Sequence, residues 1–242
     1  MSRLTRGELL RATGRGAAAL FLGEAAFAAT DQAGAMAAGR DVAAAVAAVH
    51  GRSFRSRPDI RPPPVRVSGP GGHTTAQEGY LFLAPTSPGR AQAGPLIVDP
   101  GGEPVWFRPL AAKRWATNFR VQVHQGAPVL TWWEGVVHPP GYGRGEGVIV
   151  DSSYRELARV RASHGREVDL HEFLLTPAGT ALVTCYPPAV HADLSPVGGP
   201  RDGEVLDSVI QEIDVQTGRL LFEWRGLDHV SVSESYLPQG GA

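Results

Sequence analysis

Asp169, His171 and Glu172 are three ionisable residues in close succession within a segment that otherwise has the pattern of a β-hairpin, VDLHEFLLTPAGTALVTCY (168–186). Its Thr-Pro-Ala-Gly sequence suits a type I turn between two apolar strands. Imidazole titrates near neutral pH, so His171 is a candidate general base, nucleophile or anion ligand. Asp169 could orient the ring, although alternate residues of a regular strand lie about 6.5 to 7 Å apart. The alternative is a histidine that hydrogen-bonds a neighbouring loop.

His229, in WRGLDHVSVSESY, is the second candidate catalytic residue. It follows a predicted strand that ends at Trp224, and the ionisable Asp228 stands beside it. Neighbours in sequence need not face each other, so the alternative is a loop histidine without a chemical role.

The remaining motifs predict neither a metal nor a cofactor. No two histidines have the zincin spacing, and no histidine and cysteine cluster is present. The glycine-rich GYGRGEG (141–147) lacks the G-x-G-x-x-G pattern, so we interpret it as a flexible connection rather than a phosphate cradle. The single cysteine, Cys185, excludes an intrachain disulfide and fits a small buried residue better than a nucleophile.

The composition predicts an all-β protein whose partners are neither nucleic acid nor an anionic membrane surface. The 242 residues carry a formal net charge of −1, whereas nucleic-acid-binding surfaces are strongly basic. The 30 glycines and 20 prolines are spread between β-branched and aromatic runs. This punctuation is typical of many short strands joined by tight turns.

The N-terminal part of the chain differs from the rest. Residues 1–30 combine four arginines, a short apolar stretch and a possible Ala-Phe-Ala cleavage site, which predicts an export signal. The apolar stretch is too short to span a membrane, and the alternative is a poorly ordered Ala-rich helix. Residues 31–76 are predicted to form an Ala-rich helix and then a Pro/Gly-rich linker. The folded domain is therefore expected to occupy residues 77–242.

A degenerate repeat within residues 77–242 predicts a β-propeller. Three segments share an apolar strand, an aspartate, a polar turn and a second apolar strand, with the aspartates at Asp99, Asp151 and Asp214. Aspartate recurs at such turns because its carboxylate accepts hydrogen bonds from the backbone amides that follow. Two hairpins of a second form alternate with these segments. Four strands per period of roughly 40 to 60 residues is typical of a propeller blade, and the chain holds about three such blades.

Several ordered blocks of the sequence resemble the arylsulfotransferase-like family. They are SRPDIRPPPV, PVLTWWEG, GYGRGEGVIVDSSY, DLHEFLLTPAGTALVT and DSVIQEIDVQTGRLLFEWRGLDHVSVSESY. The resemblance covers roughly residues 54–236. The resemblance implies an exported six-bladed propeller with a central funnel. It also implies transfer of sulfate from an aryl sulfate to a phenol through a sulfohistidine, without a nucleotide sulfate donor.

The resemblance also implies roles for individual residues. His171 matches the first histidine motif of the family, whose role is to bind and stabilise the sulfuryl group. His229 matches a family position to which we assign no specific role. Later blocks of the forms Asp-Tyr-x-His-x-Asn and Gln-His-Asp, the second holding the nucleophile, have no counterpart in the sequence. The expectation is therefore a propeller truncated at its C-terminus, with little or no activity.

A non-catalytic propeller that binds a ligand or a protein is the competing hypothesis. Within it, IDVQTGRLLFEW loosely resembles the repeats of quinone-cofactor propellers. In those repeats a tryptophan follows the glycine by about four places, whereas Phe222 occupies that place after Gly218. The quinone variant of this hypothesis is therefore less favoured than simple binding.

Overall fold

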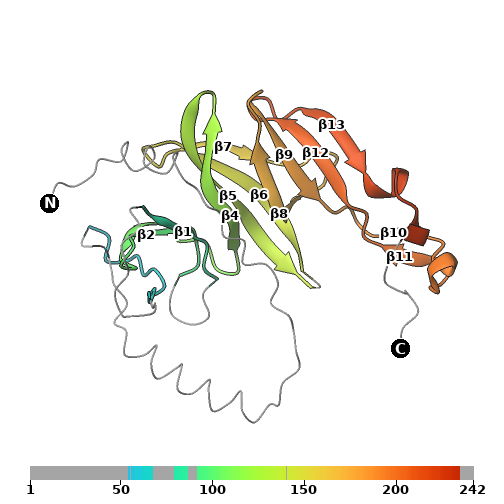
Figure 1. The fold of residues 1–242 in the computed structure, drawn as a ribbon, viewed down its shortest axis with the longest axis horizontal. Helices are drawn as coiled ribbons and strands as arrows, with labels where there is room; N and C mark the ends of the chain where they lie inside the picture. The colour runs from blue at the N-terminus through green and yellow to red at the C-terminus, as the bar shows by residue number, and fades with distance from the viewer. Residues whose placement is uncertain (1–53, 55, 68–78, 87–91, 140, 235–242) are drawn as a thin grey trace, which may run out of the picture. The chain divides into compact units, whose positions relative to one another are not determined.

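The computed structural model describes residues 54, 56–67, 79–86, 92–139 and 141–234 (Figure 1). These residues form several antiparallel sheets and no α-helix, which confirms the all-β prediction. Among them, no helix is long and apolar enough to cross a membrane. The predicted export signal (1–30) and most of the predicted helix and linker (31–76) lie outside the described residues.

The described residues fall into two compact units that meet between Leu110 and Ala111 in sequence. The earlier unit holds an antiparallel sheet in the order β1-β2-β3. Its strands are β1 (Leu81–Leu83), β2 (Leu96–Val98) and β3 (Pro104–Phe107). Ile60, from the proline-rich segment, packs with residues of β2 and β3 in a small core of its own.

The later unit begins with an antiparallel meander, here called the first meander, in which each strand pairs with the next. Its strands are β4 (Trp115–His124), β5 (Ala127–His138), β6 (Tyr142–Val150) and β7 (Glu156–Val160).

A second meander follows with the order β8-β9-β12-β13 (Figure 1). Its strands are β8 (Val168–Leu175), β9 (Thr180–Cys185), β12 (Val209–Asp214) and β13 (Leu220–Arg225). A separate hairpin of β10 (Val190–Ala192) and β11 (Gly203–Val205) lies between β9 and β12 in sequence. Only the pair Gly145 and Val168 links the two meanders into one sheet within the described residues.

The hairpin predicted at 168–186 is confirmed, and so is its turn. Gly179 donates its N–H to the carbonyl of Thr176 at 3.1 Å, which closes a four-residue turn. Gly179 has a φ of 79°, a left-handed conformation that glycine adopts without a steric cost.

The repeated aspartates have the predicted local role. Asp99 Oδ1 accepts the N–H groups of Gly101 and Glu103, both at 2.9 Å. Asp151 Oδ1 accepts those of Ser153 and Arg155 at 2.7 and 2.9 Å, and Asp214 Oδ1 accepts the N–H and hydroxyl of Thr217. The same feature, an aspartate carboxylate that accepts hydrogen bonds from the residues after it, therefore stabilises three turns. They are the turns between β2 and β3, between β6 and β7, and between β12 and β13.

The core between the two meanders is built around two aromatic rings, Trp133 of β5 and Phe173 of β8, both fully buried. Strand β6 passes these rings closely because it is rich in glycine. A Cβ atom at Gly143 would lie 2.6 Å from the Trp133 ring, and one at Gly147 would lie 2.5 Å from the Phe173 ring. The interpretation of GYGRGEG (141–147) as a flexible connection is therefore wrong: most of it is strand β6, and its glycines make room for aromatic side chains.

We expect Gly147→Ala to destabilise the fold by about 1–3 kcal/mol, because the added methyl group overpacks the core against Phe173. Phe173→Leu should also destabilise alone, yet the double variant should recover part of the loss because the smaller side chain leaves room. Urea denaturation of the four proteins measures this coupling. A double variant whose loss equals the sum of the two single losses would contradict the proposed contact.

The aspartate turns also predict a pH dependence. Hydrogen bonds hold the pKa of Asp151 below its ordinary value, first from the Arg155 amide, and those from Thr217 do so for Asp214. This contribution to stability is complete above the ordinary aspartate pKa of about 3.9 and is lost as pH falls through the lower folded-state pKa. We expect the Asp151→Asn/Asp214→Asn variant to lose less stability than the wild type between about pH 5 and about pH 2.5. Urea denaturation across this range tests it, and parallel pH curves would contradict it.

Candidate functional site

The segment that carries His171 leaves the regular strand ladder. Val168 pairs with Cys185, but the next pair in this hairpin is Phe173 with Val183. The four residues 169–172 therefore lie opposite the single residue Thr184. This irregularity replaces the strict alternation of a strand and allows side chains two residues apart to meet.

Asp169 and His171 form a hydrogen-bonded pair. The Asp169 side chain is fully buried, and one of its carboxylate oxygens accepts both the backbone N–H and the ring Nδ1 of His171. The other oxygen accepts the N–H of Gly143 on β6 at 2.6 Å. The contact that regular strand spacing made doubtful is thus present, because residues 169–172 do not follow that spacing.

This pairing defines which ring nitrogen of His171 faces a ligand. A carboxylate only accepts hydrogen bonds, so Nδ1 carries the proton in the contact with Asp169. Nε2 is then the nitrogen left for other partners, and the His171 side chain is 56% exposed. A buried carboxylate behind a half-exposed imidazole is the arrangement that orients a histidine for acid–base or anion-binding chemistry.

Side chains from β4 hydrogen-bond to the backbone of β8, although these two strands form no ladder among the described residues. Leu170 O accepts hydrogen bonds from Thr117 Oγ1 at 2.7 Å and Asn118 Nδ2 at 2.8 Å. Further along, Phe173 O accepts from Arg120 Nη2 at 2.7 Å and Gln122 Nε2 at 3.0 Å. Sequence reasoning missed this group of polar residues.

Arg120 also pairs with Glu172, the third ionisable residue of the opening motif. Glu172 accepts its own strand's Phe173 N–H at 2.9 Å as well. The carboxylate of Glu172 is therefore engaged with β4 and β8, whereas Asp169 is the carboxylate that contacts the histidine.

His229 lies at the opposite edge of the second meander from His171. It follows β13 at the end of the short 3₁₀ helix Gly226–Asp228, and its ring stacks on Trp224 with centroids 5.3 Å apart. Strands β9 and β12 separate β13 from β8, a lateral distance of about 14 Å at ordinary strand spacing. The structure therefore does not bring the two predicted histidines together.

Trp224, but not His229, lines an open cavity of about 350 Å³. Asp207 also lines it, but its carboxylate is already engaged by Arg225 Nε at 3.2 Å and Leu227 N–H at 3.0 Å. The remaining walls are largely apolar.

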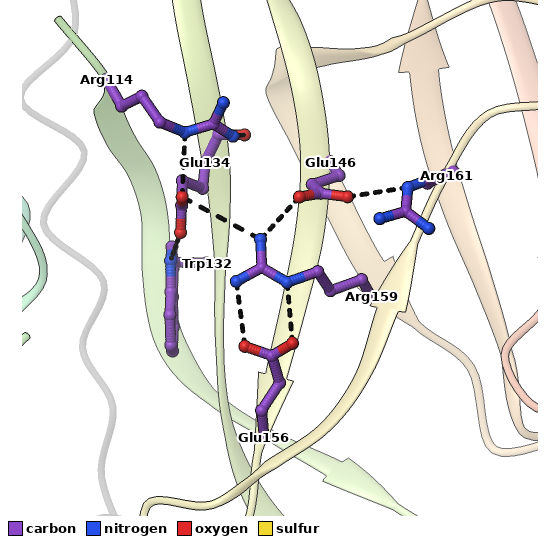
Figure 2. A network of polar contacts seen from close by, with 7 residues as sticks. All are labelled: Arg114, Trp132, Glu134, Glu146, Glu156, Arg159 and Arg161. Carbon is purple, nitrogen blue, oxygen red and sulfur yellow. Dashed lines mark hydrogen bonds and ion pairs between the residues drawn. The ribbon is translucent and has the colours of Figure 1, made fainter. Parts of the chain in front are cut away.

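A second polar cluster extends from Arg114, directly before β4, across β5, β6 and β7 of the first meander, and Figure 2 shows Arg159 at its centre. Arg159 contacts Glu156 at 2.7 Å, Glu146 at 2.5 Å and Glu134 at 3.9 Å. Arg114 and Arg161 complete the charge balance through Glu134 and Glu146, each at 2.9 Å (Figure 2). The hydrogen bond with Glu156, followed by that with Glu146, raises the pKa of Arg159.

This cluster is best explained as structural. Glu134 and Glu146 are directly opposite on β5 and β6, and two like charges at that spacing repel each other unless cations lie between them. Three arginines supply those cations.

Cys185 is fully buried, and burial raises the pKa of its thiol to about 11. The prediction of a small buried residue is confirmed, since a nucleophilic cysteine needs a lowered pKa and access. Over the described residues, no group of three or more metal-ligating side chains was found.

These features define an all-β protein made of paired antiparallel meanders, with an aspartate-held histidine on the first strand of the second meander. Residues 120–239 match the family model described as arylsulfotransferase (ASST). This match supports the arylsulfotransferase-like family that the sequence blocks indicated. No curated protein and no solved structure gives a significant match.

The buried pair predicts a specific response to Asp169→Asn. Asparagine keeps the size, but its Nδ2 is a donor, so the two donors of His171 would face an amide that satisfies only part of them. We expect the neutral ring to move its proton from Nδ1 to Nε2, which ¹⁵N NMR of labelled histidine detects. Asp202→Asn, which alters the exposed partner of His191, is the control and should leave the His171 signals unchanged. Unchanged signals in Asp169→Asn would contradict the pairing.

Proposed function

We propose that this arylsulfotransferase-like chain binds the sulfuryl group of an aryl sulfate at His171. The observation that carries the proposal is the buried carboxylate of Asp169 behind the half-exposed ring of His171. The family match supports the substrate class, since the family implies aryl sulfates as small-molecule substrates.

The geometry gives His171 a defined contact with substrate. With both ring nitrogens protonated, Nε2–H donates to a sulfuryl oxygen while the Asp169 carboxylate balances the charge of the ring. A donor aimed at sulfuryl oxygens stabilises the negative charge that they carry during transfer to a phenol. His171 is thus proposed as the sulfuryl-binding residue of the transfer reaction. His229 is proposed only as a peripheral residue, because it lies at the other edge of the meander.

We also propose that the two meanders are neighbouring blades of a propeller. Their first strands, β4 and β8, are joined by side-chain hydrogen bonds, as expected of inner strands around a common axis. The outer face of the second meander, on the side away from the shared core, carries apolar residues around Glu212, which lies between Leu182 and Phe222. The apolar residues are Leu174, Leu182, Ile210, Phe222 and Trp224, of which Leu174, Ile210 and Phe222 are exposed. Such a face suits a further blade packed against it.

We also propose that the protein is exported, on the basis of the family match and the N-terminal sequence. Proteins of this family are typically exported, and the arginine-containing, apolar N-terminal sequence fits a signal of that kind.

Binding and turnover of a chromogenic aryl sulfate test the proposal. We expect His171→Ala to weaken aryl sulfate binding about tenfold or more in calorimetry, because a hydrogen bond to a charged group contributes about 1.5–3 kcal/mol. His191→Ala is a matched control, since His191 is also exposed and also contacts an aspartate, Asp202, at 2.9 Å.

Transfer to a phenol acceptor, measured in the same series, separates the two hypotheses for function. Sulfuryl transfer that His171→Ala abolishes supports the family reaction, whereas binding without transfer supports a non-catalytic binding propeller. Equal affinity of the wild type and His171→Ala would refute the proposed site.

A further inference from the structure

We propose that Asn118 on β4 is a positioning residue for His171 and acts through the carbonyl group of Leu170. This inference rests on the proposed role of His171. Asn118 lies on another meander from the histidine and does not itself touch the imidazole, so the argument concerns the backbone that precedes the ring.

A β-bulge turns Asn118 toward β8. In the pairing of β4 with β5, Thr117 lies opposite Trp133 and Arg120 lies opposite Thr131. Two residues, 118 and 119, therefore face one residue of β5. Neighbours on a regular strand point to opposite faces, yet Thr117 and Asn118 both donate to the same atom, Leu170 O. The bulge is what makes this double contact feasible.

The peptide group that precedes His171 is held at both ends. Its carbonyl belongs to Leu170 and accepts the two hydrogen bonds from β4. Its N–H belongs to His171 and donates to Asp169 at 3.0 Å. Because this segment lacks ladder pairing, these contacts replace those of a regular strand and set the plane of the peptide. That plane determines the direction in which the His171 side chain leaves the backbone.

Asparagine at position 118 suits both the left-handed backbone conformation and the hydrogen bond to Leu170 O. Its φ of 54° lies in the left-handed region, which most side chains avoid and asparagine tolerates better than most. Glycine would adopt this conformation at lower cost but would lack the amide that donates to Leu170. The unfavourable backbone conformation is thus retained together with a hydrogen bond that only a side-chain donor supplies.

Gln125 provides a matched comparison on the same strand pair. Its φ is 51°, and with Gly126 it forms the two-residue turn between β4 and β5. Gln125→Gly therefore removes the same kind of strain without touching β8. If Asn118 served only the bulge, Asn118→Gly would behave in the same way as Gln125→Gly.

The experiment compares Asn118→Gly, Gln125→Gly and the wild type in two measurements. The first is ¹⁵N NMR of labelled histidine without substrate, at a pH well above the ordinary imidazole pKa of about 6.5. We expect a dominant Nδ1–H tautomer of His171 in the wild type and in Gln125→Gly, and a mixture of tautomers in Asn118→Gly. The second is the Kd for a chromogenic aryl sulfate, which should rise about five- to tenfold in Asn118→Gly alone.

Thr117→Val is a second variant that removes the other donor to Leu170 O and leaves the bulge backbone unaltered. It should shift the tautomers in the same direction, so the proposal stays testable if Asn118→Gly does not fold. Unchanged His171 signals in the folded variants would overturn the positioning role. If His171→Ala leaves the Kd unchanged, the proposed function fails, whereas the tautomer measurement still decides the role of Asn118.

Discussion

The packing of Trp133 and Phe173 between the two meanders is the constraint on which the rest of the later unit depends. Strand β6 passes these rings only because Gly143 and Gly147 carry no side chain. The same packing reaches the polar site: Trp133 Nε1 donates to Val168 O at 2.7 Å, and the Gly143 N–H donates to Asp169. The apolar core therefore fixes both the start of β8 and the carboxylate that orients the histidine.

Strands β4 and β8 satisfy some of their backbone polar groups in an unusual way. Buried backbone N–H and C=O groups need partners, and in most sheets the next strand supplies them. Between β4 and β8 the side chains of β4 do so, and Gln122 both donates to Phe173 O and accepts the Leu175 N–H at 2.8 Å. Side-chain partners impose no fixed register, so the carbonyl groups of Leu170 and Phe173 keep hydrogen-bond partners although residues 169–172 depart from strand geometry.

Local signals in the sequence were sufficient for some of these features and not for others. The turn of the hairpin at 168–186 and the aspartate turns could be predicted because the hydrogen bonds that close them join residues within four positions of each other. The glycines of β6 could not, since their reason is a contact with rings from β5 and β8. The bulge at Asn118 depends on the register with β5, which no local pattern encodes. His171 was predictable as a candidate, but its contact with Asp169 needed the irregular segment 169–172.

The hairpin of β10 and β11 shows where this fold accommodates an inserted segment. It is inserted between β9 and β12, yet these two strands keep an uninterrupted pairing over six consecutive residues. The pairing register of β9 and β12 is thus set by the hydrogen bonds between these strands and not by the length of their connection. For evolution, or for protein engineering, this connection is a tolerant insertion point at which a new recognition element can be added without disturbing the ladder between β9 and β12.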